Sequence, residues 1–111
     1  MNRLFLFVLS SFLVTEVISC AAVYKGQRIY VRECRDCHGG GQGVAASKRA
    51  REWKKLLKDD GQGLAQIHLE SQKAKKSWEY FNSDQYKSKS KDLKDFLMEY
   101  SKDSGKVPAC N

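Results

Sequence analysis

Apolar residues recur with helical periodicity in several stretches of this 111-residue chain. The clearest stretch runs from Lys91 to Lys102, where the positions i, i+3, i+4 and i+7 are all apolar and define one face of a helix. These four positions are Leu93, Phe96, Leu97 and Tyr100. The sequence Asp-Ser-Gly at 103–105 is expected to end this helix, and Pro108 prevents it from resuming.

Three further stretches are predicted to be helical, namely 23–37, 47–57 and a stretch from Leu64 to about Ser71. In the second stretch, Ala50, Trp53 and Leu57 share a face, and the following Asp-Asp-Gly at 59–61 is expected to stop the helix. No segment shows the alternation of apolar and polar residues that is typical of a strand. The sequence therefore predicts an all-α fold of about four helices.

The first 20 residues have the layout of a secretory signal. Arg3 precedes an apolar run at 4–14, and small residues follow at Ser19, Ala21 and Ala22. A membrane-spanning helix needs about 20 apolar residues, whereas Thr15 ends this run earlier. We therefore expect export to the periplasm, with residues 1–20 as a signal peptide and residues 21–111 as the functional domain.

The predicted domain is basic and small. The chain has a net charge of +7, and cleavage near Ser19 removes one charge of each sign, Arg3 and Glu16. A domain of about 90 residues has a small core, and such domains often need a disulfide, a metal or a cofactor for stability.

Two of the four cysteines form a compact motif with a histidine. Residues 34–38 read Cys-Arg-Asp-Cys-His, which is the C-x-x-C-H haem-attachment pattern. On a helix, Cys34, Cys37 and His38 lie on one face, so the two sulfurs can bind the haem vinyl groups while the imidazole reaches the iron. The glycines at 39–41 are expected to end the helix and to let the backbone pass close to the haem. The motif predicts one covalent haem c per chain.

Three other interpretations of this motif fit the sequence less well. A thioredoxin-like redox pair is expected near a βαβ pattern, which is not apparent here. A zinc site formed with Cys110 or His68 would need closely spaced ligands to share one ion. A disulfide between Cys34 and Cys37 would leave His38 and the glycines without a role.

Together these features resemble a class I monohaem cytochrome c. The resemblance lies in Gly26 and Tyr30, in the motif at 34–38, and in the last helix with Phe96 and Tyr100. It implies that the N- and C-terminal helices cross beside the haem, glycine against aromatic. Members of that family usually supply a methionine to the iron from a loop before the last helix, and this chain has no methionine there.

The second iron ligand has two candidates. The chain has two methionines and two histidines. Met98 lies inside the last helix, about 140° from Leu93 around the helix axis, whereas His68 shares a face with Leu64 and Ile67. His68 is therefore the favoured distal ligand and Met98 the less favoured one. The alternatives are a histidine hydrogen-bonded to the backbone and an iron with an open distal site, which would suit a sensor or a haem enzyme.

The second half of the chain is rich in lysine. It contains Lys73, Lys75, Lys76, Lys87, Lys89, Lys91 and Lys94. Such a face can attract acidic redox proteins of a respiratory chain, although it also serves solubility. Nucleic acid is not an expected partner outside the cytoplasm.

The remaining cysteines bear on attachment to the membrane. Residues 17–20 (Val-Ile-Ser-Cys) resemble a lipobox with Cys20 as the acylated residue, and membrane association is expected only with that lipid. An unmodified Cys20 can instead pair with Cys110. The expected function is one-electron transfer without enzymatic activity, either as a free carrier or as a fixed cytochrome subunit of a membrane oxidoreductase.

Overall fold

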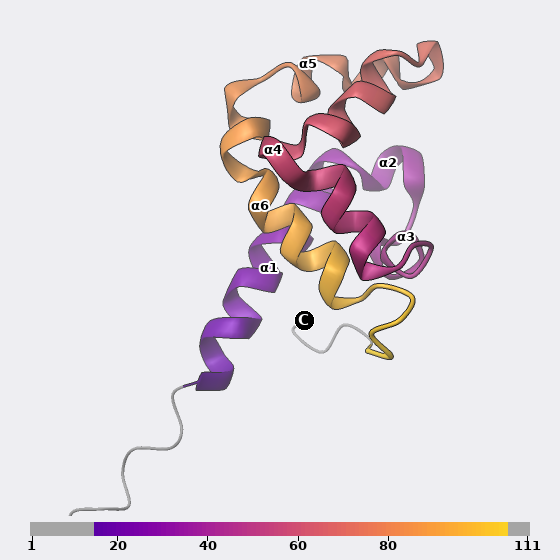
Figure 1. Ribbon diagram of the computed structural model, residues 1–111. Helices are drawn as coiled ribbons and strands as arrows, with labels where there is room; N and C mark the ends of the chain where they lie inside the picture. Colours follow the sequence, from indigo (N-terminus) through magenta and orange to yellow (C-terminus); the bar gives the residue numbers. More distant parts are fainter. Residues whose placement is uncertain (1–14, 107–111) are drawn as a thin grey trace, which may run out of the picture.

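The computed structural model describes the backbone of residues 15–106 and the side chains of residues 23–106 (Figure 1). Within this part of the chain the secondary structure is entirely helical, which confirms the predicted all-α class. Its elements are α1 (Thr15–Glu33), α2 (Arg35–His38), α3 (Gly41–Ala45), α4 (Ala50–Leu69), the 3-10 helix η1 (Gln72–Ser77), α5 (Trp78–Phe81) and α6 (Asp84–Glu99). The structure thus has more helices than the four predicted, because short helices occupy the segments between the long ones.

The first and last long helices cross closely, as the resemblance to class I cytochromes implied (Figure 1). Gly26 makes this crossing possible. A Cβ atom at Gly26 would overlap the carbonyl oxygen of Asp92 and lie 2.7 Å from Cβ of Phe96. The ring of Tyr30, one turn further along α1, packs against the ring of Phe96 with centroids 5.8 Å apart. Glycine on one helix therefore faces an aromatic residue on the other.

The main core lies between α1, α4 and α6. All four apolar residues predicted to share a face of the last helix are buried, and so are Trp53 and Leu57 of α4. The indole Nε1 of Trp53 donates to the carbonyl of Ala45 at 2.9 Å, which joins α4 to α3. The predicted amphipathic faces of both helices are confirmed.

A sharp turn inside α4 separates its two halves. Asp59, Asp60 and Gly61 have φ values of 52°, 57° and 75°, which are left-handed and interrupt the helix where the sequence predicted an end. The hydroxyl of Tyr86 donates to the carbonyl of Gly61 at 2.5 Å and holds the turn. The second half of α4 therefore leaves in a new direction, and it carries His68.

The last helix begins earlier than the sequence predicted. Ser83 accepts a hydrogen bond from the backbone N–H of Tyr86 at 3.1 Å through its Oγ, and so caps α6 before Asp84. Tyr86 and Ser90 are buried and extend the inward face toward the N-terminus. The prediction of a start at Lys91 was wrong because lysines and the polar Ser90 conceal this periodicity. Tyr86 also packs with Ala65 and Phe81 in a second, smaller core.

Predictions about the N-terminus are not tested by these helices. The predicted cleavage region lies in the first turns of α1, whose side chains up to residue 22 are outside the described part, as is Cys110. In the described residues, no helix combines the length and the apolar character needed to cross a membrane.

Candidate functional site

The C-x-x-C-H motif lies on a helical turn that directly follows α1. The backbone N–H of Cys34 donates to the carbonyl of Tyr30 at 2.8 Å, and the N–H groups of Cys37 and His38 donate to the carbonyl of Cys34 at 3.2 and 3.0 Å. This turn brings both sulfurs and the imidazole to one side of the chain. Cys34 and Cys37 are free thiols, with Cys34 half-buried and Cys37 exposed. The geometry is therefore not that of a disulfide between them.

The glycines after the motif serve the local fold. Gly39 ends α2 with a φ of 76°, a conformation that disfavours other residues. The hydroxyl of Tyr30 donates to the carbonyl of Gly39 at 2.7 Å, which fixes the backbone just after His38. A Cβ atom at Gly41 would lie 2.9 Å from Cζ of Phe96 and 3.0 Å from Cδ1 of Tyr30. The predicted helix end is confirmed. Gly41 lies close to these two rings, and the predicted approach of the glycines to the haem stays a prediction.

The motif forms one wall of a cavity of about 270 Å³. The opposite wall consists of the second half of α4, η1 and α5. The lining residues are Glu33, Cys34, Cys37, His38, Ile67, His68, Ser71, Lys73, Ala74, Ser77 and Phe81. Ile67 is 54% exposed although it is apolar, so this cavity presents an apolar surface that a bound group can cover.

His68 faces the motif from the opposite wall. Its ring centroid lies 5.9 Å from that of His38, with an angle of 75° between the ring planes. Its Nδ1 lies 2.8 Å from the carbonyl oxygen of Leu64. The structure thus brings together both histidines and both motif cysteines around one cavity.

Two aromatic residues support the wall that carries His68. The indole Nε1 of Trp78 donates to the carbonyls of His68 and Ser71 at 2.8 and 3.2 Å, and so ties α5 to the end of α4. The ring of Phe81 stacks on the imidazole of His68 with centroids 4.2 Å apart and an interplanar angle of 25°. In the sequence, Trp78 and Phe81 lie in a segment that is otherwise polar and rich in lysine. Their contacts with His68 depend on the turn in α4, which short-range periodicity does not reveal.

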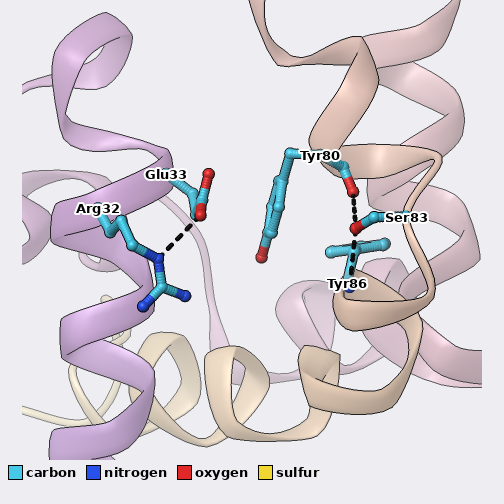
Figure 2. A network of polar contacts seen from close by, with 5 residues as sticks. All are labelled: Arg32, Glu33, Tyr80, Ser83 and Tyr86. Carbon is cyan, nitrogen blue, oxygen red and sulfur yellow. Dashed lines mark hydrogen bonds and ion pairs between the residues drawn. The ribbon is translucent and has the colours of Figure 1, made fainter.

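A network of polar and aromatic residues lies beside the cavity (Figure 2). Glu33 accepts a hydrogen bond from Nε of Arg32 at 2.9 Å. The ring of Tyr80 lies between Glu33 and Tyr86, and it packs edge-on against Tyr86 with centroids 5.2 Å apart. Burial, with smaller contributions from Cys34 and Glu33, raises the pKa of Tyr80. Tyr80 therefore remains a neutral phenol at physiological pH.

The environment of Cys34 does not favour a thiolate. Burial, followed by the charges of Glu33 and Cys37, raises the pKa of Cys34 to about 12. The nucleophilic cysteine of a redox pair has a lowered pKa instead, because its thiolate is the reactive form. This difference argues against a thioredoxin-like function.

An ion pair connects the two walls at the surface. Nζ of Lys76 in η1 lies 2.7 Å from Oδ2 of Asp36 inside the motif. The hydrogen bond and charge of Lys76 lower the pKa of the Asp36 carboxyl. Both side chains are largely exposed, so the pair contributes little to stability.

The residues around the cavity fit a covalently attached haem. A haem brings four nitrogen ligands to its iron, so the protein needs to supply only one or two axial ligands, together with the thiols and an apolar surface. His38, His68 and Ile67 line the cavity in this way. Among the described residues, no cluster of three or more His, Cys, Asp and Glu side chains is placed to hold a metal ion without a haem.

Met98 lies elsewhere. It is partly buried on α6 and packs against the main core, and it does not line the cavity. Cys20 and Cys110 lie outside the residues whose side chains are described. Their predicted roles in lipidation or in a disulfide stay predictions.

Among the comparisons with known proteins, a family model matches the chain. The family model described as cytochrome C oxidase, cbb3-type, subunit III matches residues 21–88, more than half of the chain. The matched region includes the motif, the cavity and both histidines. Searches among curated proteins and among solved structures found no significant match.

Proposed function

Since the chain belongs to the family of cytochrome c oxidase cbb3-type subunit III, we propose that it carries single electrons through one covalently attached haem c. The observation that carries this proposal is the cavity in which Cys34, Cys37 and His38 face His68. When bound, the haem supplies the one-electron chemistry through its iron. The partners are other redox proteins, and no enzymatic activity is proposed.

The residues of the attachment turn have distinct roles in this proposal. The thiols of Cys34 and Cys37 would hold the haem, each by adding across one of its vinyl groups, with the sulfur on one carbon and the proton on the other, so that no electron would be gained or lost. His38 would supply a nitrogen ligand to the iron. Tyr30 holds the backbone after His38 through its hydrogen bond to Gly39. Ile67 and Phe81 provide apolar surface that excludes water from the cavity.

Haem attachment can be tested on the purified protein. We expect intact mass to exceed the polypeptide mass by one haem and the colour to remain with the protein after acid–acetone extraction. Cys34→Ala or Cys37→Ala should leave only one thioether or none, whereas the control Cys110→Ala should retain both. Complete extraction of colour from the wild-type protein would contradict the proposal.

A fixed subunit is the second candidate function. It is favoured by the family description, which names a subunit of an oxidase. A subunit of this kind should remain with a membrane oxidoreductase through gentle detergent extraction and sediment with it, whereas a free carrier should be released as a single small species. Size-exclusion chromatography with detection of haem absorbance distinguishes the two.

Export to the periplasm belongs to the same proposal. It is supported by the charged start, the apolar run and the small residues at 19–22. N-terminal sequencing should show the loss of 19 to 22 residues, and a diacylglycerol mass on Cys20 would indicate a lipoprotein. A purified protein that still begins with Met1 would contradict export by this route.

A further inference from the structure

We propose that His68 is the second axial ligand of the iron and that Phe81 positions its imidazole. This inference rests on the proposed haem attachment at Cys34 and Cys37. It specifies what that proposal leaves open, namely whether the distal site is closed by the protein and by which side chain. A closed distal site indicates an electron carrier, whereas an open distal site indicates a sensor or a haem enzyme.

The separation of the two histidines suits a shared metal. When one metal ion binds two imidazoles on opposite sides, the ring centres lie about 6 Å apart, because each metal–nitrogen bond is about 2 Å and each nitrogen lies about 1 Å from its ring centre. The ring centroids of His38 and His68 are 5.9 Å apart. The two histidines come from α2 and from the second half of α4, so this match depends on the tertiary fold and not on local sequence.

The hydrogen bond of His68 selects the required tautomer. Because its Nδ1 lies 2.8 Å from the carbonyl oxygen of Leu64, which can only accept, Nδ1 carries the proton. Nε2 then has the free lone pair. Metal-binding histidines commonly have this arrangement, in which a backbone carbonyl or a carboxylate fixes the ring and raises its basicity. The backbone hydrogen bond and iron ligation are therefore compatible roles for this residue.

Phe81 fixes the plane of the imidazole. Its ring stacks on His68 at 4.2 Å and is itself 5% exposed. Tyr80 and Tyr86 hold Phe81 by edge-on contacts at 5.1 and 4.8 Å. Rotation of His68 away from His38 would therefore have to displace a buried aromatic cluster. Phe81 does not bind the iron, and its role is that of a positioning residue.

Among the described residues that line the cavity, His68 is the one histidine besides His38, and no methionine is present there. The chain has two methionines, and Met98 packs against the main core and not in the cavity. His38 and His68 are the two histidines of the chain. The fold therefore favours His68 over Met98 on position.

The test is spectroscopic and uses the haem-loaded protein with its haem content measured separately. We expect low-spin ferric iron, no near-infrared sulfur-to-iron band and a ferrous form that resists carbon monoxide. His68→Ala should give high-spin iron that binds carbon monoxide, and added imidazole should restore the low-spin spectrum. His68→Met should introduce the sulfur-to-iron band and raise the reduction potential, since histidine–methionine ligation gives a higher potential.

The role of Phe81 needs a separate variant. Phe81→Leu keeps an apolar side chain but loses the stacking, so the haem should remain covalently attached while carbon monoxide binds at least tenfold faster than in the wild type. The control Leu56→Ala removes packing from the main core at a residue that does not line the cavity, and it should lower stability without changing the spectrum. Equal effects of the two variants on carbon monoxide binding would overturn the positioning role.

The outcomes separate this inference from the one on which it rests. A wild-type protein with covalent haem and high-spin iron would overturn the assignment of His68 and leave haem attachment intact. A change of spin state in Met98→Leu but not in His68→Ala would overturn it as well. A wild-type protein without covalent haem would overturn the proposed function, and this inference with it.

Discussion

The contact at Gly26 leaves no space for a side chain. A Cβ atom there would overlap the backbone carbonyl of Asp92, which cannot be relieved by a change of rotamer, and would also press on Phe96. We expect Gly26→Ala to separate α1 from α6 and to destabilise the protein by about 1–3 kcal/mol. Denaturant unfolding followed by far-ultraviolet circular dichroism measures this loss.

Gly43 is the matched control for Gly26. It also lies in a helix, α3, but a Cβ atom built there meets no atom within 4 Å. Alanine favours helix over glycine by up to about 1 kcal/mol, so Gly43→Ala should be neutral or slightly stabilising. A loss of stability at Gly43 as large as that at Gly26 would show that helix propensity, and not the contact with Asp92, governs both positions.

Individual residues of the site differ in how well the sequence predicts them. Cys34, Cys37 and His38 can be predicted as haem-attachment residues from the sequence because the proposed chemistry depends on local spacing within one turn. Phe81 cannot, because nothing in its own segment indicates that it stacks on His68. The contact of Gly41 with the rings of Tyr30 and Phe96 cannot be predicted either, because it depends on the crossing of α1 and α6.

Among the helices, the interruption of α4 has the clearest energetic test. Tyr86 is 1% exposed, and its hydroxyl donates to the carbonyl of Gly61 within the turn. Tyr86→Phe leaves that buried carbonyl without its partner, which should cost about 1–3 kcal/mol. Thermal unfolding measures the change. Tyr24→Phe, at a position that is 44% exposed, is the control and should have little effect; an equal loss in both variants would contradict a special role for this hydrogen bond.

The boundaries of helices depend on interactions that periodicity does not show. The buried faces of α6 and of the first half of α4 were predicted correctly because apolar residues recur at three and four positions. In the second half of α4 the predicted face was wrong in part, since Ile67 is 54% exposed and Ala65 is the buried residue. The start of α6 was not predicted correctly, because the cap at Ser83 and the buried Ser90 are polar and resemble the solvent-exposed lysines around them. The short helices η1 and α5 are held by contacts with α4, such as the hydrogen bonds of Trp78, and not by a pattern of their own.

Across the whole molecule, the positive charge is expected to guide encounters with partners. Lys73 lines the edge of the cavity and Lys75 lies close to it in η1, and both are exposed. Replacing both by Glu should lower the rate of electron transfer with an acidic redox protein about tenfold at low salt, because steering by charge commonly changes association rates by this factor or more. Stopped-flow measurements at increasing ionic strength should show the difference shrinking as salt screens it.

Lys54 and Lys55 provide a control with the same change in net charge. Both are exposed on the first half of α4, and neither lines the cavity. Their replacement by Glu should affect the rate much less than the pair in η1. Equal effects would show that net charge, and not a defined face, governs association.

The crossing of α1 and α6 also bears on the order of events during folding. Gly26 and Asp92 are in contact although most of the domain lies between them in sequence. Bringing the two ends of so long a segment together costs chain entropy before the contact can stabilise the fold. Proteins whose contacts are distant in sequence therefore fold more slowly than those with local contacts. The attachment turn at 34–38 is local and precedes α6 in the chain, so it can form while the last helix is still undocked. We therefore expect the thiols of the motif to be accessible before α6 docks onto the core.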